Sequence, residues 1–243
     1  MTVFTTAQIE FIESVLALNP KIATFDCDGT LWSGDAGEGF FSWELEPEQN
    51  LVSPEIASWI RKRYADYKAG KVAEDVMCGE MVTMHRGLQE DVVQRACDTY
   101  FGQAIAPNIF PEMQELVRRM QASGCDVWAV SSSNQWIIRS GMRSFGIPKN
   151  RILSAEVAVE NGPNGVTITD RLIRVPSGPG KSEAIRSVLK SAPDCAFGNA
   201  IWDREMLAMS KHAFAINPNL NLEEIARANG WKIYQPDTKR SVR

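Results

Sequence analysis

Residues 21–32 read KIATFDCDGTLW, a short apolar run that ends in two aspartates, Asp26 and Asp28. Short apolar runs that end in polar loop residues are typical of strands buried in a parallel sheet. Residues two apart on an extended chain project to the same side, so the two carboxylates can share one face. Carboxylates this close repel each other unless a cation or a proton lies between them. A hard divalent ion with oxygen ligands fits, and we expect Mg²⁺.

The same pattern of a strand followed by polar residues recurs in the C-terminal part of the chain. Ser131 ends an apolar strand, Lys181 opens a helix after three loop residues, and Asn199 and Asp203 follow another strand. Repeated strand–helix units predict the α/β class, with a parallel sheet covered on both faces. Ligands of such sheets bind at the carboxyl ends of the strands, where these polar residues lie. The expected strands are 21–25, 126–130, 195–197, 213–216 and 232–234, and a β-hairpin is expected from 152–160 and 166–175 around turn residues 161–165.

Residues 35–105 have helical spacing and few strand-like runs. Helices are expected at about 54–70, 72–84 and 89–100. This stretch separates the first strand from the rest of the sheet. We therefore predict a core of residues 1–34 and 106–243, with residues 35–105 as an inserted helical cap.

The composition excludes several classes of function. The 243 residues carry 26 Lys and Arg against 30 Asp and Glu, a net charge of −4. This argues against nucleic acid or a membrane as the main partner, although a local cluster of donors can still bind a small anion. Five scattered cysteines without a Cys-x-x-Cys pair favour reduced thiols and a cytoplasmic location. The only histidines, His85 and His212, are expected to be packing or surface residues, and the sequence does not indicate an oligomeric state.

Four motifs together resemble those of the haloacid dehalogenase superfamily, in its phosphoserine-phosphatase-like branch. They occur in family order as residues 26–31 (DCDGTL), Ser131, Lys181 and residues 198–207 (GNAIWDREML), and residues 215–218 (AINP) also resemble this branch. The resemblance spans nearly the whole chain. It implies a Rossmann-like core with a helical cap and a phosphomonoester hydrolase that acts on a small phosphorylated metabolite.

The resemblance also implies a role for each motif residue. Asp26 would attack phosphorus and form an aspartyl-phosphate, and Asp28 would protonate the leaving alkoxide and then activate water. This chemistry agrees with general principles, because a carboxylate beside Mg²⁺ stays ionised while a neighbouring carboxyl group moves the proton. The phosphoryl oxygens would be held by Ser131, Ser132 and Lys181, and Mg²⁺ by Asp26, Asp28, Asn199 and Asp203.

Asn199 departs from the family pattern, which has an aspartate as a direct metal ligand at this position. An asparagine still offers a carbonyl oxygen but removes one negative charge. A catalytically impaired relative that only binds phosphate esters therefore remains an alternative. A phosphotransferase acting on another alcohol is a second one, whereas a dehalogenase is disfavoured because dehalogenases generally lack the aspartate seen here as Asp28.

The start of the cap points to the substrate. Asp35 lies nine residues after Asp26, the spacing at which phosphoserine phosphatases contact the substrate amino group. No cap arginine could be assigned to a substrate carboxylate. Besides a phosphoserine-like substrate, an amine without a carboxylate, such as phosphocholine or phosphoethanolamine, would therefore suit the acid together with aromatic residues such as Trp43. The alternatives are a helix cap for Asp35 and helix packing for Trp43, Trp59 and the Met77, Met81 and Met84 stripe.

Overall fold

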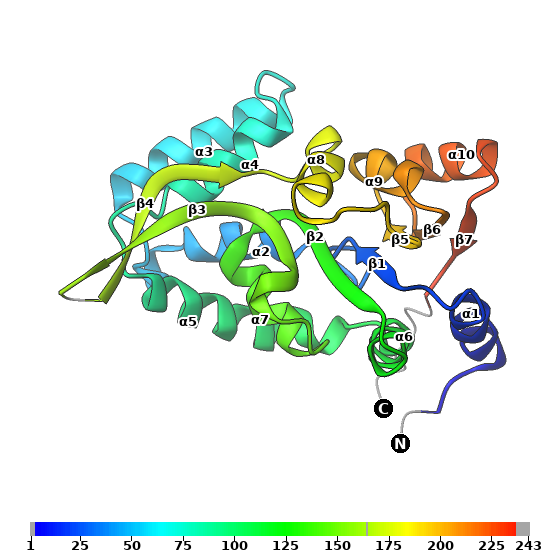
Figure 1. Ribbon diagram of the computed structural model, residues 1–243. Helices are drawn as coiled ribbons and strands as arrows, with labels where there is room; N and C mark the ends of the chain where they lie inside the picture. Colours follow the sequence, from blue (N-terminus) through cyan, green and yellow to red (C-terminus); the bar gives the residue numbers. More distant parts are fainter. Residues whose placement is uncertain (1–2, 164, 237–243) are drawn as a thin grey trace.

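The structure is a computed structural model that describes residues 3–163 and 165–236. Within this part of the chain, seven strands form one sheet in the order β4-β3-β2-β1-β5-β6-β7 (Figure 1). Neighbouring strands are parallel except β3 and β4, which form an antiparallel hairpin. The strands are β1 (Ile22–Phe25), β2 (Asp126–Asn134), β3 (Ile152–Gly162), β4 (Gly165–Arg174), β5 (Cys195–Gly198), β6 (His212–Ile216) and β7 (Lys232–Tyr234). The predicted α/β fold with a hairpin is confirmed, while Asn164 of the predicted turn lies outside the described residues.

Both faces of the sheet are covered by helices, because successive strand residues project to opposite sides. On β2, Val127 and Ala129 belong to one apolar cluster, and Trp128 and Val130 belong to another. The first cluster is completed by α1 (Thr6–Leu16), α6 (Pro111–Ala122) and α7 (Gln135–Arg143). The second is completed by α8 (Pro179–Val188), α9 (Arg204–Met209) and α10 (Leu220–Ala228), on the other side of the sheet in Figure 1.

The strand register brings the polar segments together. Phe25 at the end of β1 pairs with Ala129 on one side and with Phe197 on the other. Asp26 therefore leaves the sheet beside the ends of β2 and β5. These three neighbouring strand ends form the floor on which the candidate site is built.

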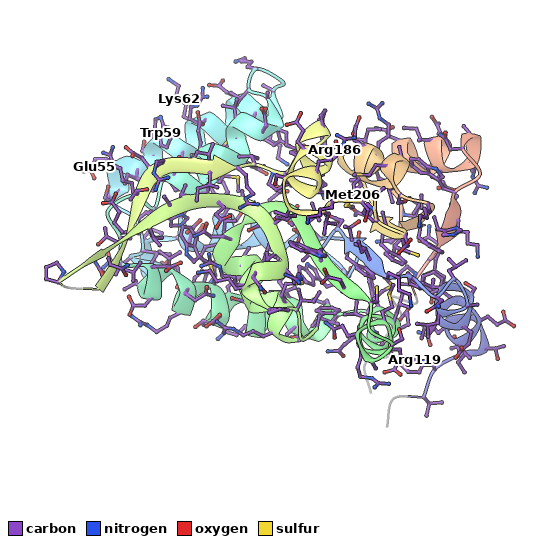
Figure 2. All side chains as sticks on the ribbon, in the orientation of Figure 1. Glu55, Trp59, Lys62, Arg119, Arg186 and Met206 are labelled. Carbon is purple, nitrogen blue, oxygen red and sulfur yellow. The ribbon has the colours of Figure 1, made fainter. Side chains whose placement is uncertain are left out.

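The segment between β1 and α6, which we propose as the cap, is helical and has its own apolar cluster. Phe41, Ile60 and Met77 form part of this cluster. Trp59 is not packed there: it is 45% exposed and projects from the outer side of α3 (Figure 2). The helices are α2 (Ala36–Glu44), α3 (Pro54–Lys68), α4 (Glu74–Thr83) and α5 (Glu90–Tyr100), followed by a π-helical turn (Phe101–Ile105) and short 3-10 turns at Pro47–Gln49 and Ala106–Asn108.

The β3–β4 hairpin extends from the core alongside these helices (Figure 1). Gln89 at the start of α5 donates to the hydroxyl of Thr167 on β4 at 3.0 Å, and Arg86 pairs with Asp170 at 3.0 Å. The sequence pattern predicted both the hairpin and the helices, but not their contact. These contacts between the hairpin and the inserted helices help to hold the helices above the carboxyl ends of the strands.

Two local features differ from the sequence expectation. The helix α2 was not among the helices given bounds, although a helix cap at Asp35 was one alternative; its sequence AGEGFFSWE contains two glycines, which are poor helix formers. It forms because Asp35 caps its N-terminus and because Phe40 and Phe41 bury their rings. The strand β2 is also longer than expected and runs through the polar residues to Asn134, whose side chain then caps α7.

Candidate active site

A buried lysine lies between two aspartates at the floor of the site. The Nζ atom of Lys181 donates to Asp26 Oδ1 at 2.6 Å, to Asp203 Oδ1 at 2.5 Å and to the main-chain carbonyl of Val130 at 3.1 Å. All three side chains are almost fully buried. Three segments far apart in the sequence are thus joined by one ammonium group, which holds the Asp26 carboxylate in a fixed orientation.

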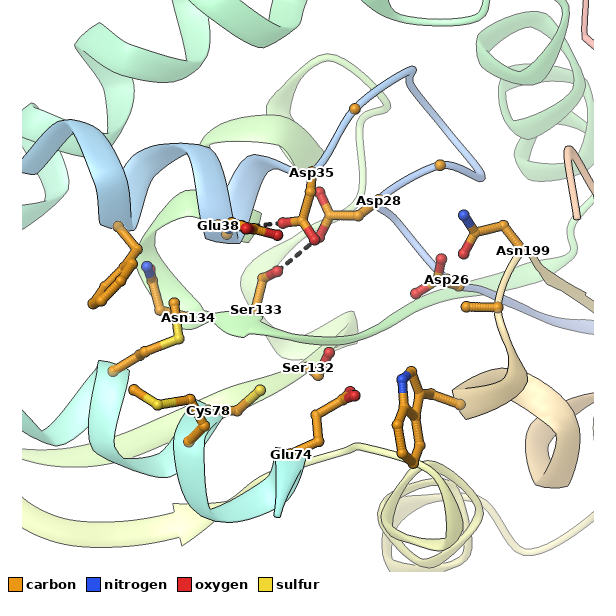
Figure 3. A pocket seen from close by; sticks show the side chains of 18 of the residues that line it. Asp26, Asp28, Asp35, Glu38, Glu74, Cys78, Ser132, Ser133, Asn134 and Asn199 are labelled. Atoms are coloured by element: carbon orange, nitrogen blue, oxygen red, sulfur yellow. Dashed lines mark hydrogen bonds between the residues drawn. The ribbon is translucent and has the colours of Figure 1, made fainter. Parts of the chain in front are cut away.

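Asp203 supports the loop after β5. Its Oδ2 atom accepts from the main-chain N–H groups of Asn199 and Ala200 at 2.9 and 3.0 Å. Since Lys181 takes Oδ1, both Asp203 oxygens already have partners. Asp203 thus positions this loop, and its role as a metal ligand stays a prediction, since both oxygens of Asp26 are partnered in the same way by Lys181 and Thr30. Asn199 also lines the cavity. Figure 3 shows the side chains of Asn199 and Asp26 pointing towards one another.

Asp28 is held by donors from three directions. Its Oδ1 atom accepts from Trp32 Nε1 at 2.9 Å and from the main-chain N–H of Ala36 at 2.6 Å. Its Oδ2 atom accepts from the hydroxyl of Ser133 at 2.7 Å (Figure 3). The carboxyl group is therefore fixed beside the N-terminus of α2.

The two predicted catalytic aspartates differ from ordinary carboxyl groups. Burial, reinforced by the charge of Asp203 and opposed by that of Lys181, raises the pKa of Asp26 to about 7. Burial, reinforced by the charge of Asp35, raises the pKa of Asp28 to about 8. At neutral pH Asp28 therefore carries a proton that it can donate, which is the state a general acid requires.

These residues line a cavity of about 470 Å³ between the strand ends and the helices α2, α3 and α4. Among the residues that the structure describes, the wall carries seven carboxylate side chains, one lysine and no arginine. The carboxylates are Asp26, Asp28, Asp35, Glu38, Glu44, Glu74 and Asp203. Aromatic and sulfur-containing side chains complete the wall, among them Phe41, Tyr64, Tyr67, Trp202, Met77 and Met81. The cavity is strongly anionic, and a cationic group fits it better than a second anion.

Asp35 has two roles in the structure. Its Oδ1 atom accepts from the main-chain N–H of Glu38 at 2.7 Å, which makes Asp35 the N-cap of α2. It also lines the cavity, close to Asp28 (Figure 3). The expected alternatives of helix cap and substrate contact are therefore compatible, because a carboxylate can accept several hydrogen bonds at once.

Some predicted site residues lie away from the cavity. Trp43 does not line it: its ring packs against Phe40 and Tyr100, with centroids 5.8 and 5.7 Å away. This corrects the expectation of a substrate contact for Trp43, because α2 turns that position away from the cavity. Ser131 is buried beneath the surface, where its hydroxyl accepts from the main-chain N–H of Ser133, whereas Ser132 lines the cavity.

Sequence reasoning missed other residues of the site. Thr30 donates to Asp26 Oδ2 at 2.8 Å, and its place in the first motif was a signal for this role. Ser133 is the last of three consecutive serines, and the sequence does not indicate which of them contacts Asp28. The structure shows that it is Ser133. Glu44 and Glu74 come from segments whose side-chain direction no sequence pattern indicated.

The donors fit a hard divalent cation at the Asp26 end of the cavity. The candidate oxygen ligands are the Asp26 carboxylate, the amide carbonyl of Asn199 and the main-chain carbonyl of Asp28. Gly29 leaves the space for this amide, since a Cβ atom there would lie 1.8 Å from Asn199 Nδ2. In residues 3–163 and 165–236, no three His, Cys, Asp or Glu side chains gather closely enough to hold a metal. Binding of a cation here would therefore depend on the amide carbonyl of Asn199 and the main-chain carbonyl of Asp28 in addition to Asp26.

Comparison with known proteins agrees with this geometry. Residues 23–208, more than half of the 243 residues, match the family model of the haloacid dehalogenase-like hydrolases. A histidinol-phosphatase of Neisseria meningitidis is 25% identical over 224 residues, which cover 88% of this chain and 97% of that protein. A phosphoserine phosphatase of Mycobacterium tuberculosis is 26% identical over 187 residues, which cover 74% of this chain and 53% of that protein.

Solved structures show the same fold. A protein of unknown function from Bordetella pertussis Tohama I has a TM-score of 0.73 at 19% identity, covering 90% of this chain and 98% of that one. A substrate-bound phosphoserine phosphatase has a TM-score of 0.58 at 16% identity, covering 90% and 93%. No helix among the described residues combines the length and apolar character needed to cross a bilayer. The family match, the fold and the order of the motifs lead to one conclusion: the chain belongs to the haloacid dehalogenase-like hydrolase family, as an enzyme of its phosphatase type.

Proposed function

We propose that this chain is a Mg²⁺-dependent phosphomonoesterase that acts through an aspartyl-phosphate on Asp26. The observation that carries the proposal is the pairing of two differently held carboxyl groups at one end of the cavity. Asp26 is fixed by Lys181 and Thr30, and Asp28 is held in a position that raises its pKa. One group is oriented to attack and the other is protonated and able to release its proton.

The residues support a balanced two-step reaction. An Asp26 oxygen attacks phosphorus, the ester P–O bond breaks, and the leaving alkoxide takes the proton of Asp28. Water then attacks phosphorus, gives a proton to Asp28, and the bond to Asp26 breaks to release inorganic phosphate. Mg²⁺, when bound, supplies positive charge for the phosphoryl oxygens and keeps Asp26 ionised. Lys181 contributes positive charge beside Asp26, and Ser132 and Ser133 in the last part of β2 supply donors that would hold the phosphoryl group in place.

The substrate class is a phosphomonoester that carries an amine and no carboxylate. The cavity wall supports this proposal, because Asp35 lies beside Asp28 and, in the described part of the chain, no arginine lines the wall to pair with a substrate carboxylate. Phosphoethanolamine and phosphocholine meet this description. Histidinol phosphate, indicated by the name of the Neisseria meningitidis relative, also carries an amine and no carboxylate. A cavity of about 470 Å³ has room for its ring as well as for the amine and the phosphate.

The experiment measures phosphate release from p-nitrophenyl phosphate, histidinol phosphate, phosphoethanolamine, phosphocholine and phosphoserine, with Mg²⁺ and after chelation. We expect turnover of the aryl phosphate that chelation abolishes, and a preference for amine-bearing substrates over phosphoserine. Binding of phosphate esters without turnover at any Mg²⁺ concentration would instead identify the impaired relative that Asn199 leaves open. Phosphoryl transfer to an added alcohol in place of water would identify a phosphotransferase.

A further inference from the structure

The helix α2 runs along the cavity and links its two ends. At its N-terminus, the main-chain N–H of Ala36 donates to Asp28. Gly37, Glu38, Phe41 and Glu44 follow along the helix as lining residues. Ala36 and Glu44 are eight residues apart, which corresponds to about 12 Å along a helix. Glu44 therefore marks the end of the cavity remote from the reacting phosphoryl group.

Glu44 is a buried carboxyl group with one unused oxygen. Its side chain is 1% exposed, and its Oε2 atom lies 2.7 Å from Nε2 of His85, which is fully buried. Across residues 3–163 and 165–236, His85 is its one hydrogen-bond partner, so Oε1 has none. Buried carboxylate oxygens are rarely left without a donor, and Glu44 lines a cavity large enough to admit one.

The histidine keeps this oxygen an acceptor whichever group carries the proton. Nδ1 of His85 lies 3.2 Å from the main-chain carbonyl of Val82 and must donate to it. Nε2 then either donates to an ionised Glu44 or accepts from a protonated one through Oε2. In both cases Oε1 of Glu44 keeps its lone pairs and remains an acceptor, on a residue that lines the cavity.

The other carboxylates of the cap already have donors. Glu38 accepts from the hydroxyl of Tyr64 and pairs with Lys68 at 3.1 Å. Glu74 accepts from the hydroxyl of Ser177 at 2.8 Å, which joins α4 to the loop before Lys181. Among the described residues, both oxygens of Glu74 have donors, since Tyr67 also donates to it at 3.4 Å. The second oxygen of Glu38 has no protein donor among them, but its side chain is 46% exposed and open to water. Glu44 differs because its carboxyl group is only 1% exposed.

The surroundings of Glu44 favour a flat ring. Phe41 lies one helical turn before it and packs against Tyr64 with ring centroids 5.0 Å apart. Met77 and Met81 line the same cavity. Aromatic and thioether walls with a single acceptor at the end suit an aromatic heterocycle that presents an N–H group.

We propose that Oε1 of Glu44 accepts a hydrogen bond from the ring N–H of a nitrogen heterocycle at the end of the substrate remote from the phosphate. Glu44 is thus a specificity-determining residue, and the preferred substrate carries two nitrogen groups, an amine near Asp35 and a heterocycle near Glu44. This inference rests on the proposed function. The proposed hydrogen bond would make the enzyme distinguish substrates that carry the same amine and differ only in their ring.

The test compares two substrates of equal length. Histidinol phosphate and phenylalaninol phosphate have the same phosphate and amine, but the second carries a phenyl ring in place of the imidazole. We expect kcat/KM to favour histidinol phosphate by about one to two orders of magnitude, because a site built to accept a hydrogen bond rejects an analogue that lacks the donor. Equal values for the two substrates would overturn the inference.

Two variants assign the preference to Glu44. Glu44→Leu removes the acceptor, and Glu80→Leu is the matched control, since Glu80 pairs with Arg63 on the same cap outside the cavity. We expect the preference to fall to about unity in Glu44→Leu and to persist in Glu80→Leu. A preference that persists in a folded Glu44→Leu protein would also overturn the inference. If thermal unfolding shows that this variant does not fold, the comparison of substrates on the unaltered protein still decides.

The aryl phosphate separates this inference from the proposed function. Mg²⁺-dependent turnover of p-nitrophenyl phosphate without discrimination between the two rings refutes only the role of Glu44. Absence of turnover on every phosphate ester refutes the proposed function itself.

Discussion

Replacing Asp35 by asparagine tests the substrate class without disturbing the fold. Asp35 caps α2 through Oδ1, and asparagine caps helices about as well as aspartate. Asp35→Asn therefore keeps the hydrogen bond to Glu38 and removes only the negative charge. The charge itself lies in the cavity beside Asp28, where we propose that the substrate amine binds.

The size of the effect follows from the charge-assisted hydrogen bond that the substrate amine would make to this exposed carboxyl group at the cavity wall. A hydrogen bond to a charged group contributes about 1.5–3 kcal/mol. At about 1.4 kcal/mol for each factor of ten, the loss in kcat/KM for an amine-bearing substrate is about 10- to 150-fold. The loss for p-nitrophenyl phosphate is less than about twofold at the pH optimum, because this substrate has no cation.

The same substitution shifts the pH profile. After burial, the charge of Asp35 is the largest cause that raises the pKa of Asp28. Asp35→Asn removes this repulsion, so the pKa of Asp28 falls. Since Asp28 must be protonated to act as the acid for a poor alkoxide leaving group, the alkaline limb of the profile for histidinol phosphate moves to lower pH. The limb for p-nitrophenyl phosphate moves less, because p-nitrophenolate leaves without a proton.

The assay compares kcat/KM of both proteins on histidinol phosphate and on p-nitrophenyl phosphate between pH 5 and pH 9. Thermal unfolding of both proteins shows whether the substitution weakens the N-terminal capping of α2 and so lowers stability. Equal losses on the two substrates would show that Asp35 only supports the structure. Unchanged values on both would place the amine elsewhere and refute the reasoning from the cavity charge.

Three other changes test separate parts of the structure. Asp26→Asn should lower turnover of every substrate by at least about three orders of magnitude while the protein stays folded, and steady-state rates with circular dichroism check this. Asn199→Asp should lower the Mg²⁺ concentration that gives half-maximal activity, since it adds a negative charge; an unchanged or higher requirement in a metal titration would mean that this side chain is not a ligand. Gly141→Ala should destabilise the protein by about 1–3 kcal/mol, because the new Cβ would lie 2.8 Å from the ring of Trp32. Gly102→Ala is the control: its Cβ meets no described atom within 4 Å, so stability should change by less than about 1 kcal/mol. Denaturant unfolding measures both changes.

Local patterns in the sequence were sufficient for the sheet and for the main parts of the site. Apolar runs that end in Asp26, Ser131 and Asn199 predicted parallel strands with polar carboxyl ends, and the register of β1 with β2 and β5 confirms it. Thr5 and Gln8 have the spacing of a capping box at the start of α1, and both of its hydrogen bonds are present. Such features are predictable because they depend on residues only a few positions apart.

Side-chain direction in the cap could not be predicted in the same way. Trp43 and Glu44 are neighbours on α2, yet one packs against Tyr100 and the other lines the cavity. Which of the two enters the cavity depends on how the helix is rotated against the core. That rotation is set by the capping of α2 at Asp35 and by the packing of Phe40 and Phe41, which come from the whole fold.

The sequence alone determined the order of the motifs, the α/β class and the identity of the two aspartates, since each is encoded in short stretches of the chain. Only the tertiary structure decided which groups meet across long separations: Lys181 with Asp26 and Asp203, Ser133 with Asp28, and His85 with Glu44. The raised pKa of Asp28 has the same origin, because burial and the charge of Asp35 act through space. Contacts and burial of this kind depend on how distant segments pack, and no local pattern in the sequence contains that information.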